Sequence, residues 1–370
     1  NGGEVIAAMF AVWKAGGVLV PINPRLTPTE VARIEREVVG RRYDDGVALV
    51  SFTSGTTGPP KPVPLLHARV LEGLDQVLAT LRSKPSGDRA APMPNLIPVS
   101  LSLWAGIYQV LFAFTVGAPV VVMEQFDTVE FAALVRRFDI RSTVLPPAAM
   151  VMLADDDRID DLAPLKYVRS ISAPLSPLQA RRFRDRFGIG VLNGYGQTEL
   201  GGEVVGWSAA DSKAFGDEKL GAVGRAHPGV EVTTDGDTDE LLVRIPGRFD
   251  DWQHTGDVGR IDDDGFVWVD GRLSDMVNRG GLKVHPAEVE EVLRLSPSVA
   301  DAAVVGVPDD RLGEVPVAFV VAAADLDTAA LDALCRTHLA AYKVPVRFEQ
   351  VDALPRNDAG KVVKRELLRS

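Results

Sequence analysis

Short apolar runs rich in β-branched residues alternate with amphipathic segments over about the first two thirds of this 370-residue chain. Five runs are typical of buried strands: GVALVSF (46–52), GAPVVVM (117–123), STVLP (142–146), YVRSIS (167–172) and GVLNGY (190–195). Helical spacing of apolar residues appears between them, in segments 103–114, 129–138 and 176–187. This alternation predicts an α/β fold in which helices cover the faces of a sheet.

The pattern changes from about Val230 onward. The segments 240–246 (ELLVRIP) and 259–272 (GRIDDDGFVWVDGR) indicate shorter strands, and the DDDG turn in the second predicts a β-hairpin. After Gly271, strand-like runs such as VADAAVVGVPD (299–309) accompany helical segments. We therefore expect a β-rich subdomain followed by a small α+β domain.

Net charge, hydropathy and cysteine content limit the binding partners and the compartment that we expect for this protein. A formal net charge of -11 argues against nucleic acid or an anionic membrane as the main partner. No run reaches the roughly 18 apolar residues that a transmembrane segment needs. The single cysteine, Cys335, excludes an intrachain disulfide and fits a reducing compartment. We expect a cytoplasmic protein with this thiol buried in its core.

The opening segment 2–24 is apolar but contains charged residues. Its apolar residues fall at helical spacing: Val5, Ile6, Met9, Phe10 and Trp13. The spacing predicts a core helix that leads into a strand. Because the segment has no basic leader, we expect a chain that starts within a domain, not a signal peptide.

The stretch SFTSGTTGPPKPVPLLH (51–67) is the most unusual segment of the chain. Glycines let backbone N–H groups converge on an anion, hydroxyl groups add donors, and a lysine adds a mobile positive charge, so this composition suits phosphate. Lys61 stands between two prolines, which excludes the Walker pattern and the start of a helix, so the donors must come from the loop itself. An ordinary solvent loop has the same composition.

Two further polar segments add candidates for nucleotide chemistry. In NGYGQTE (193–199), Tyr195 could stack on a base, Thr198 could bond a phosphate, and Glu199 could offer an oxygen to Mg²⁺. In HTGD (254–257), Asp257 is an acceptor suited to sugar hydroxyls. A polar strand end and a charged surface turn are the alternatives for these segments.

Two segments near the C-terminus complete the set. The first, GRLSDMVNRGGLKVHPAEVE (271–290), offers Arg272 and the pair Gly280–Gly281. The second, PRNDAGKVVKREL (355–367), places Lys361 after a glycine on an expected exposed turn. Taken singly, both segments also fit solvated surface turns.

In this order and at these spacings, the five segments resemble the adenylate-forming superfamily, which includes acyl-CoA synthetases, luciferases and the adenylation domains of peptide synthetases. The resemblance extends to residues 11–27 (AVWKAGGVLVPINPRLT), 173–177 (APLSP) and 221–232 (GAVGRAHPGVEV). It implies a large adenylation domain over residues 1–273, incomplete at its N-terminus, with helix-covered sheets and a β-rich subdomain. A small, mobile α+β lid domain would follow over residues 274–370.

The resemblance also implies an activity. A carboxylate attacks the α-phosphorus of ATP, giving an acyl-adenylate and pyrophosphate, and a thiol, usually of coenzyme A, then displaces AMP. The implied ATP- and AMP-binding residues are Thr53, Ser54, Gly55, Thr56, Thr57, Gly58, Lys61, Ser172, Ala173, Pro174, Asn193, Gly194, Tyr195, Gly196, Thr198, Asp257 and Arg272.

Particular roles follow from the same resemblance. Lys361, Thr198 and Glu199 would be catalytic, with Lys361 between the carboxylate and the phosphate and Glu199 on Mg²⁺. Asp257 and Arg272 would hold the ribose, and Tyr195 would stack on the adenine. After rotation about a hinge at Ser274, Gly280 and Gly281 would approach coenzyme A. Lys364, three residues beyond the catalytic lysine, is expected to matter little.

Three residues depart from the family pattern. Pro62 stands where a glycine is usual, Leu101 follows Ser100 where an aromatic–histidine pair is common, and Ser274 replaces a charged hinge residue. These departures keep open a non-catalytic nucleotide-binding relative. The chain is also short, with only 26 residues between Pro24 and Ser51, which we ascribe to absent segments.

The acyl pocket implied by the resemblance is apolar. Its candidate residues are Leu101, Leu103, Trp104, Ile107, Ala148 and Leu175. Because an unpaired charge is costly to bury, this set favours a monocarboxylic fatty or aryl acid, although plain core packing explains it equally well. The partners would be this small acid, ATP and coenzyme A, and an acyl carrier protein is the alternative thiol acceptor.

Overall fold

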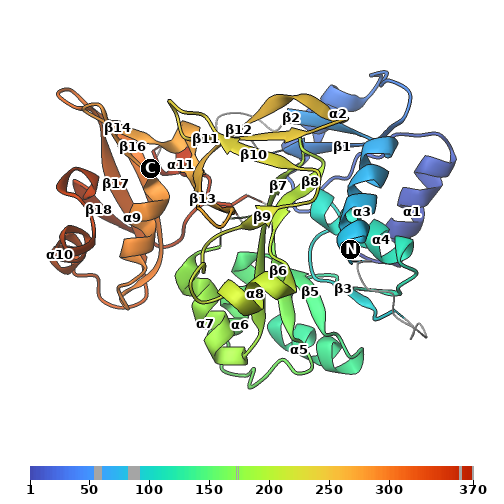
Figure 1. The fold of residues 1–370 in the computed structure, drawn as a ribbon, viewed down its shortest axis with the longest axis horizontal. Coiled ribbons are helices and arrows are strands. Elements are labelled where there is room, and N and C mark those ends of the chain that lie inside the picture. Colours follow the sequence, from blue (N-terminus) through green and yellow to red (C-terminus); the bar gives the residue numbers. More distant parts are fainter. Residues whose placement is uncertain (54–60, 82–91, 172, 174, 358–360, 369–370) are drawn as a thin grey trace. The chain divides into compact units, whose positions relative to one another are not determined.

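The computed structural model describes all residues except 54–60, 82–91, 172, 174, 358–360 and 369–370. The described residues form two compact units (Figure 1). The first unit runs from Asn1 to Leu220, and the second runs from Gly221 to Ser370 and includes Ser176–Leu178. The functional boundary predicted at residues 273/274 falls inside the second unit and stays a prediction.

A small sheet that is mostly parallel forms the centre of the first unit. Strands β5 (Ser142–Leu145), β6 (Tyr167–Ser170) and β7 (Gly190–Gln197) are parallel, and β8 (Gly202–Gly206) pairs antiparallel with β7. Helices α5 (Thr128–Arg137), α6 (Pro147–Asp155) and α7 (Pro177–Phe187) lie beside these strands. Phe131, Met150 and Phe183, one from each helix, share a hydrophobic core with the sheet. The predicted α/β architecture is confirmed here.

The same unit holds a second core around helices α1 (Gly3–Lys14), α3 (His67–Leu81) and α4 (Trp104–Thr115). The strands beside it form two pairs: antiparallel β1 (Val47–Thr53) and β2 (Lys61–Leu66), and parallel β3 (Asn95–Ile97) and β4 (Val120–Val122). The remaining helices of the unit are α2 (Pro28–Val38) and α8 (Ala209–Phe215).

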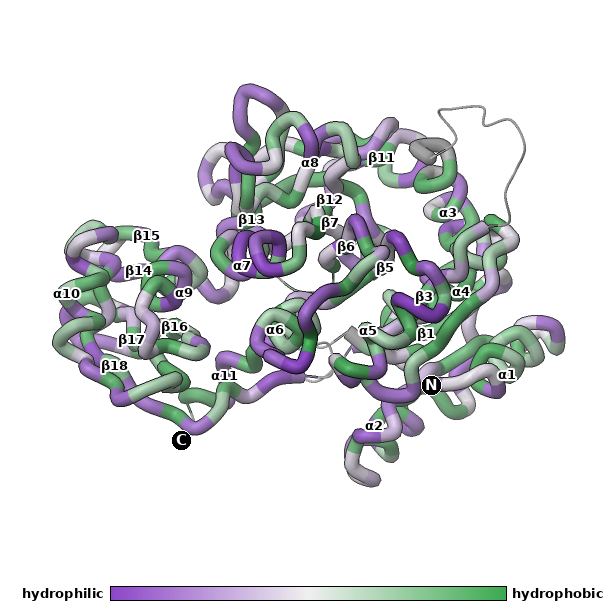
Figure 2. Tube along the Cα trace, turned by 90° about the horizontal axis from the view of Figure 1, so that it is seen from below, coloured by the Kyte–Doolittle hydropathy of each residue, from purple (hydrophilic) through white to green (hydrophobic). Residues whose placement is uncertain are grey.

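Helix α1 is only partly the core helix that the spacing predicts. Ile6 and Met9 are buried, whereas Val5 is 46% exposed and Phe10 is 37% exposed. Figure 2 shows this helix mostly in the colours of hydrophobic residues, so its apolar side chains exceed what its buried face needs. The strand expected after the helix is reduced to one bridge between Leu19 and Leu49.

The second unit begins with an antiparallel sheet in the order β10-β11-β12-β13-β9. Its strands are β9 (Gly224–Ala226), β10 (Glu231–Thr234), β11 (Glu240–Ile245), β12 (Phe249–Ile261) and β13 (Phe266–Arg272). The predicted DDDG hairpin joins β12 to β13, where the Asp262 carboxylate accepts hydrogen bonds from the N–H groups of Asp264 (3.1 Å) and Phe266 (2.9 Å).

The C-terminal part of this unit is the predicted small α+β fold. Its strands are β14 (Val277–Arg279), β15 (Leu282–Val284), β16 (Val299–Asp309), β17 (Gly313–Ala322) and β18 (Arg347–Val351). Its helices are α9 (Pro286–Leu293), α10 (Thr328–His338) and the short α11 (Lys364–Leu367), with 3-10 turns at Leu273–Asp275 and Ala341–Lys343. Strand β16 stands at the end of the order β15-β14-β17-β16, and β18 pairs in parallel with β17.

Alternate residues of β16 divide the small sheet into two faces. Ala302 and Val304 pack with α9 and α10, whereas Ala303 and Val305 pack with Leu354 and Leu367 of the C-terminal segment. The predicted burial of the single cysteine is confirmed, because Cys335 of α10 is fully buried in the first of these cores. Burial raises the pKa of the Cys335 thiol to about 11, so it is a packing group.

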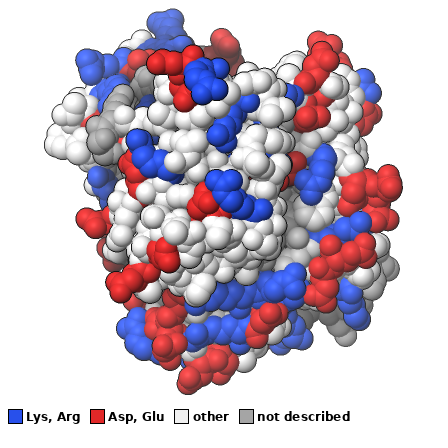
Figure 3. All heavy atoms as spheres, turned by 90° about the vertical axis from the view of Figure 1, so that its left-hand side faces the viewer, with Lys and Arg blue, Asp and Glu red and all other residues white. Residues whose placement is uncertain are grey.

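No helix in the described part of the chain is long and apolar enough to cross a membrane. Figure 3 shows acidic and basic side chains next to one another on the face that it draws.

Candidate active site

The turn between β7 and β8 presents the residues predicted to face the phosphates and the metal. Strand pairing ends at Gln197 opposite Gly202, so Thr198 and Glu199 lie in the connecting turn. The N–H of Gly201 donates to the carbonyl of Thr198 (2.9 Å), and the side chain of Glu199 is exposed. The carboxylate of Glu199 is therefore accessible on a turn whose backbone is fixed by two paired strands.

Close contact between β7 and β8 explains the glycines of the NGYG motif. A Cβ atom at Gly194 would lie 2.6 Å from Oε2 of Glu203, and one at Gly196 would lie 1.9 Å from the carbonyl oxygen of Gly202. Tyr195 between them is half-buried, and its hydroxyl accepts a hydrogen bond from Gln197 (3.3 Å). Asn193 is buried, and its carbonyl accepts the N–H of Trp207 (3.2 Å).

The carboxylate of Glu203 belongs to a polar cluster that the sequence did not predict. It pairs with the guanidinium of Arg169 on β6, which also donates to the carbonyl of Trp207 (3.2 Å). Tyr108 of α4 lies near this pair, and burial raises the pKa of its hydroxyl, with the negative charge of Glu203 acting in the same direction. Arg169 and Glu203 lie on the two strands that flank β7, and the carboxylate of Glu203 comes close to Gly194 of the predicted nucleotide motif.

In the second unit, strand pairing brings Asp257 and Arg272 together. They lie opposite each other on β12 and β13, and Nε of Arg272 is 2.9 Å from Oδ1 of Asp257. The carboxylate of Asp257 is buried, and Arg272 also donates to the carbonyl of Thr255 (3.2 Å). Buried charges are found paired because desolvation is costly, so this ion pair fixes the direction of both side chains. The family resemblance implies that both residues hold the same ribose, but it does not predict their contact with each other.

Glu240 shapes the irregular part of β12 that carries Asp257, where the pairing with β11 shifts register, and the sequence did not predict this role. One oxygen of its buried carboxylate accepts the N–H of Gly256 (2.7 Å), and the other lies 2.8 Å from Nδ1 of His254. The hydrogen bond and the negative charge of Glu240 raise the pKa of His254. Gly256 has a φ of 70°, where residues with a Cβ are strained, so the HTGD irregularity in β12 depends on both the glycine and the glutamate.

The predicted glycine pair, Gly280–Gly281, forms the two-residue turn between β14 and β15. Both φ values are positive (60° and 88°), as a tight hairpin of this kind requires. The N–H of Gly281 donates to the side chain of Asn278 (2.9 Å). Hairpin geometry therefore accounts for both glycines, and their contact with coenzyme A stays a prediction. Ser274 is exposed in the 3-10 turn just before this hairpin, and its hinge role also stays a prediction.

Lys361 is exposed on a segment whose backbone is held on both sides. Its N–H donates to Oδ1 of Asn357 (2.9 Å), and its carbonyl accepts the N–H of Asn357 (2.9 Å). The N–H of Val363 donates to the carbonyl of Pro355 (2.7 Å). The expected exposed turn is therefore a hydrogen-bonded arm, and residues 358–360 within it lie outside the described residues.

Much of the predicted phosphate loop lies outside the described residues, namely Ser54, Gly55, Thr56, Thr57 and Gly58, as do Ser172 and Pro174 of the later segment. Thr53 is the last residue of β1, and it pairs with Lys61, the exposed first residue of β2. Pro62, the departure from the family pattern, lies opposite Phe52 in the same strand pair. The segment after the loop is thus a strand. Ala173 is half-buried.

Four of the candidate acyl-pocket residues, Leu101, Trp104, Ala148 and Leu175, do not form one group. Leu101 and Trp104 are buried in the core around α1 and α4, together with Ile107. Leu175 belongs to the separate core around α5, α6 and α7, and Ala148 is exposed. Core packing therefore accounts for the buried members, and contact with an acyl group stays a prediction for all four.

Comparison with known proteins identifies the class. The AMP-binding enzyme family matches residues 39–247, and the AMP-binding enzyme C-terminal domain matches residues 288–361. The chain therefore belongs to the adenylate-forming superfamily, as the resemblance predicted.

The chain is similar to several individual members of that superfamily. A methyl-dioxo-octahydroindenyl propanoyl:CoA ligase from Rhodococcus jostii is 37% identical over 87% of this chain, and the chain spans 65% of that enzyme's length. ScoC, a fatty acid–acyl-carrier-protein ligase from Streptomyces coeruleorubidus, is 31% identical over 98% of this chain and 73% of its own length. ATP-bound MatB from Rhodopseudomonas palustris superposes with a TM-score of 0.83 at 25% identity, over 99% of this chain and 86% of that one.

Proposed function

We propose that this chain activates a carboxylic acid with ATP to an acyl-adenylate and then transfers the acyl group to the thiol of coenzyme A. The observation that carries the proposal is the match of both family regions within one chain, the second of which ends at Lys361. Lys361, to which the resemblance gives the adenylation role, is exposed on a hydrogen-bonded arm.

In the first step, an oxygen of the substrate carboxylate attacks the α-phosphorus of ATP, and the bond to pyrophosphate breaks. Both reactants are anions, so positioning and charge neutralisation are the main catalytic effects. Lys361 supplies a cation for the carboxylate and the phosphate, and the paired Asp257 and Arg272 orient the ribose. In the second step, the thiol sulfur attacks the acyl carbon and AMP leaves.

Glu199 is the residue that would hold Mg²⁺. Mg²⁺ is usually bound by one or two carboxylates together with substrate phosphates and water, so a single exposed carboxylate on a fixed turn fits it. When bound, the ion would neutralise phosphate charge. No cluster of three or more His, Cys, Asp or Glu residues able to hold a metal occurs among the described residues, which is compatible with a metal held mainly through ATP.

The acid is proposed to be a fatty or aryl monocarboxylate, because the candidate residues for the acyl group are apolar. Coenzyme A is the proposed acceptor, as the name of the Rhodococcus relative suggests. The name of ScoC supports an acyl carrier protein as the alternative. The buried, unreactive Cys335 leaves no candidate thiol of the chain itself among the described residues.

The test is pyrophosphate release from ATP with a panel of carboxylic acids, each without acceptor, with coenzyme A and with an acyl carrier protein. Acid-dependent release supports the adenylation step, and the acceptor that gives a thioester identifies the second substrate. If release is independent of every acid while ATP still binds, the chain is a non-catalytic nucleotide-binding relative.

A further inference from the structure

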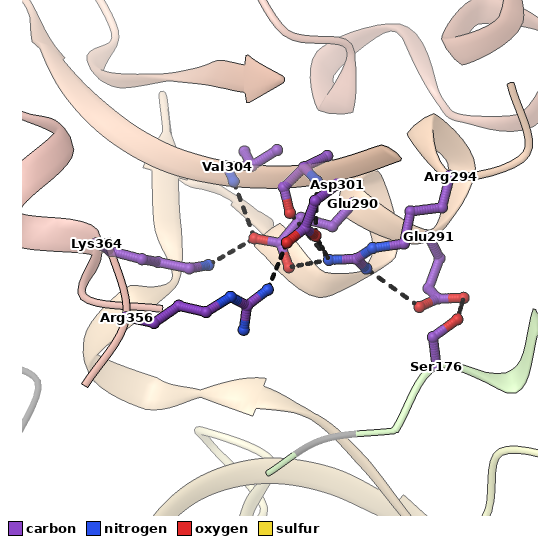
Figure 4. A network of polar contacts seen from close by, with 9 residues as sticks. Ser176, Glu290, Glu291, Arg294, Asp301, Val304, Arg356 and Lys364 are labelled. Carbon is purple, nitrogen blue, oxygen red and sulfur yellow. Dashed lines mark hydrogen bonds and ion pairs between the residues drawn. The ribbon is translucent and has the colours of Figure 1, made fainter. Parts of the chain in front are cut away.

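The arm that carries Lys361 is joined to the small α+β fold by two ion pairs (Figure 4). On one side of the lysine, Arg356 pairs with Asp301 of β16. On the other side, Nζ of Lys364 lies 2.8 Å from Oε1 of Glu290 on α9. Lys361 therefore lies between two attachment points, five residues after one and three residues before the other.

The two carboxylates that hold the arm, those of Asp301 and Glu290, both also lie near the guanidinium of Arg294. Nη2 of Arg294 lies 3.4 Å from Oδ1 of Asp301 and 3.9 Å from Oε2 of Glu290, and the Arg294 side chain is only 17% exposed. Glu290 is 12% exposed and Lys364 is 22% exposed, so the second pair is shielded from water. Shielding strengthens an ion pair and makes the loss of either partner costly.

The network is also fixed to the backbone of β16. Oε1 of Glu290 accepts the N–H of Val304 (2.8 Å), and Arg294 donates to the carbonyl of Ala302 (2.9 Å). The carboxylate that holds Lys364 is thus held by a strand that belongs to both hydrophobic cores of the small fold. A displacement of the arm would have to break contacts with a rigid element.

We propose that Lys364 and Arg356 are positioning residues that hold the arm in the place where Lys361 can reach the reacting anions. The proposal rests on the proposed function, because it assigns a task to the catalytic lysine. A catalytic side chain carried on such an arm loses reaction rate when the arm shifts, and a misplacement of about 1 Å can cost roughly 100-fold. The proposal departs from the expectation that Lys364 matters little, because the ammonium group of Lys364 is paired with Glu290.

The small fold offers a matched control. Nζ of Lys343 lies 2.6 Å from Oε2 of Glu288, so it also joins a lysine to a glutamate of α9. The two lysines are almost equally exposed, at 20% for Lys343 and 22% for Lys364. Lys343→Met therefore removes another lysine–glutamate ion pair of α9 without touching the arm, although Glu288 (42% exposed) is less shielded than Glu290 (12%). Lys364→Met removes the pair that holds the arm.

The experiment measures the two half-reactions separately on the full chain. Acid-dependent exchange of pyrophosphate with ATP reports adenylation, and thioester formation from supplied acyl-adenylate reports transfer. We expect Lys364→Met to lose about 10- to 100-fold in adenylation with little change in transfer, Lys343→Met to lose neither, and Lys364→Arg to recover most of the rate. Glu290→Gln, which keeps an oxygen for the Val304 N–H, should match Lys364→Met, and the double variant should lose no more than the worse single variant.

A second readout does not depend on activity. Hydrogen exchange of a peptide over residues 355–367 should become faster in Lys364→Met and stay unchanged in Lys343→Met, because only the first frees the arm. Equal behaviour of these two variants, or an equal loss in both half-reactions, overturns the proposal. If the unsubstituted chain shows no acid-dependent exchange, the proposed function fails, and the exchange of this peptide alone decides whether Lys364 holds the arm.

Discussion

Replacing Gly196 by alanine tests whether the close approach of β7 and β8 is what places Thr198 and Glu199. The new Cβ would lie 1.9 Å from the carbonyl oxygen of Gly202, whereas real Cβ atoms essentially never come closer than 3.0 Å. The backbone must therefore open by at least 1.1 Å, the difference of these two distances, and no rotamer change can relieve a backbone contact. The turn that starts at Thr198 must move with it.

The expected cost has two parts. Overpacking of this kind destabilises a protein by about 1–3 kcal/mol. A shift of about 1 Å in the groups that meet the reactants can lower the rate of adenylation by roughly 100-fold. The assays are urea unfolding and acid-dependent pyrophosphate exchange on the same preparation, with the rate measured where the variant is fully folded.

Gly194→Ala is the matched control for this prediction. Its Cβ would meet the end of the Glu203 side chain at 2.6 Å, and a side chain can rotate away. We expect a loss of about 1 kcal/mol from the disturbed pair with Arg169 and a smaller loss of rate than in Gly196→Ala. If the two variants are equally active, or if Gly196→Ala behaves like the unsubstituted chain, then strand contact does not position this turn.

Four further predictions concern the catalytic lysine, the metal, the hinge and pH. Lys361→Ala should lose most adenylation while keeping ATP binding and transfer from supplied acyl-adenylate, measured as separate half-reactions; equal losses would contradict its role. Glu199→Gln should weaken Mg²⁺-dependent rates more than nucleotide binding, which a Mg²⁺ titration of both forms shows. Ser274→Pro should keep one half-reaction and lose the other with little change in stability, because proline restricts φ at the expected pivot. Glu240 raises the pKa of His254. The pair therefore stabilises the fold fully below the ordinary histidine pKa of about 6.5, and this stabilisation is lost as pH rises through the raised pKa. His254→Gln should accordingly lower the free energy of unfolding more at about pH 6 than at about pH 9.

Periodicity and turn chemistry are local properties, and the elements that depend on them were predicted well. The run 190–195 became β7, the spacing of 129–138 became α5, and the DDDG turn became the β12–β13 hairpin. Helix α1 was harder because periodicity tells how apolar a face is, not how much partner surface is available to cover it. That is why Phe10 is exposed although it belongs to the apolar set.

Contacts between residues far apart in sequence could not be predicted in the same way. Asp257 and Arg272 were named for one ligand, but their ion pair depends on the register of two strands. Glu240 shapes the HTGD irregularity of β12 from the neighbouring strand. Glu290 holds Lys364 from 74 residues away, in a fold whose helix packing the sequence pattern does not specify. Spacing suggests which residues carry the chemistry, whereas tertiary packing decides which residues hold them in place.

The position of β16 at the end of its sheet has a consequence for association between copies of this chain. An uncovered outer strand presents unpaired N–H and C=O groups on which a strand of another molecule can add, and this is a route to aggregation. Here the outward N–H of Val304 and the outward C=O of Ala302 are already bonded to Glu290 and Arg294. Glu290, which holds the arm through Lys364, and Arg294 therefore also occupy part of this edge. We expect a chain that lacks both side chains to associate with other copies more readily as well as to lose adenylation rate.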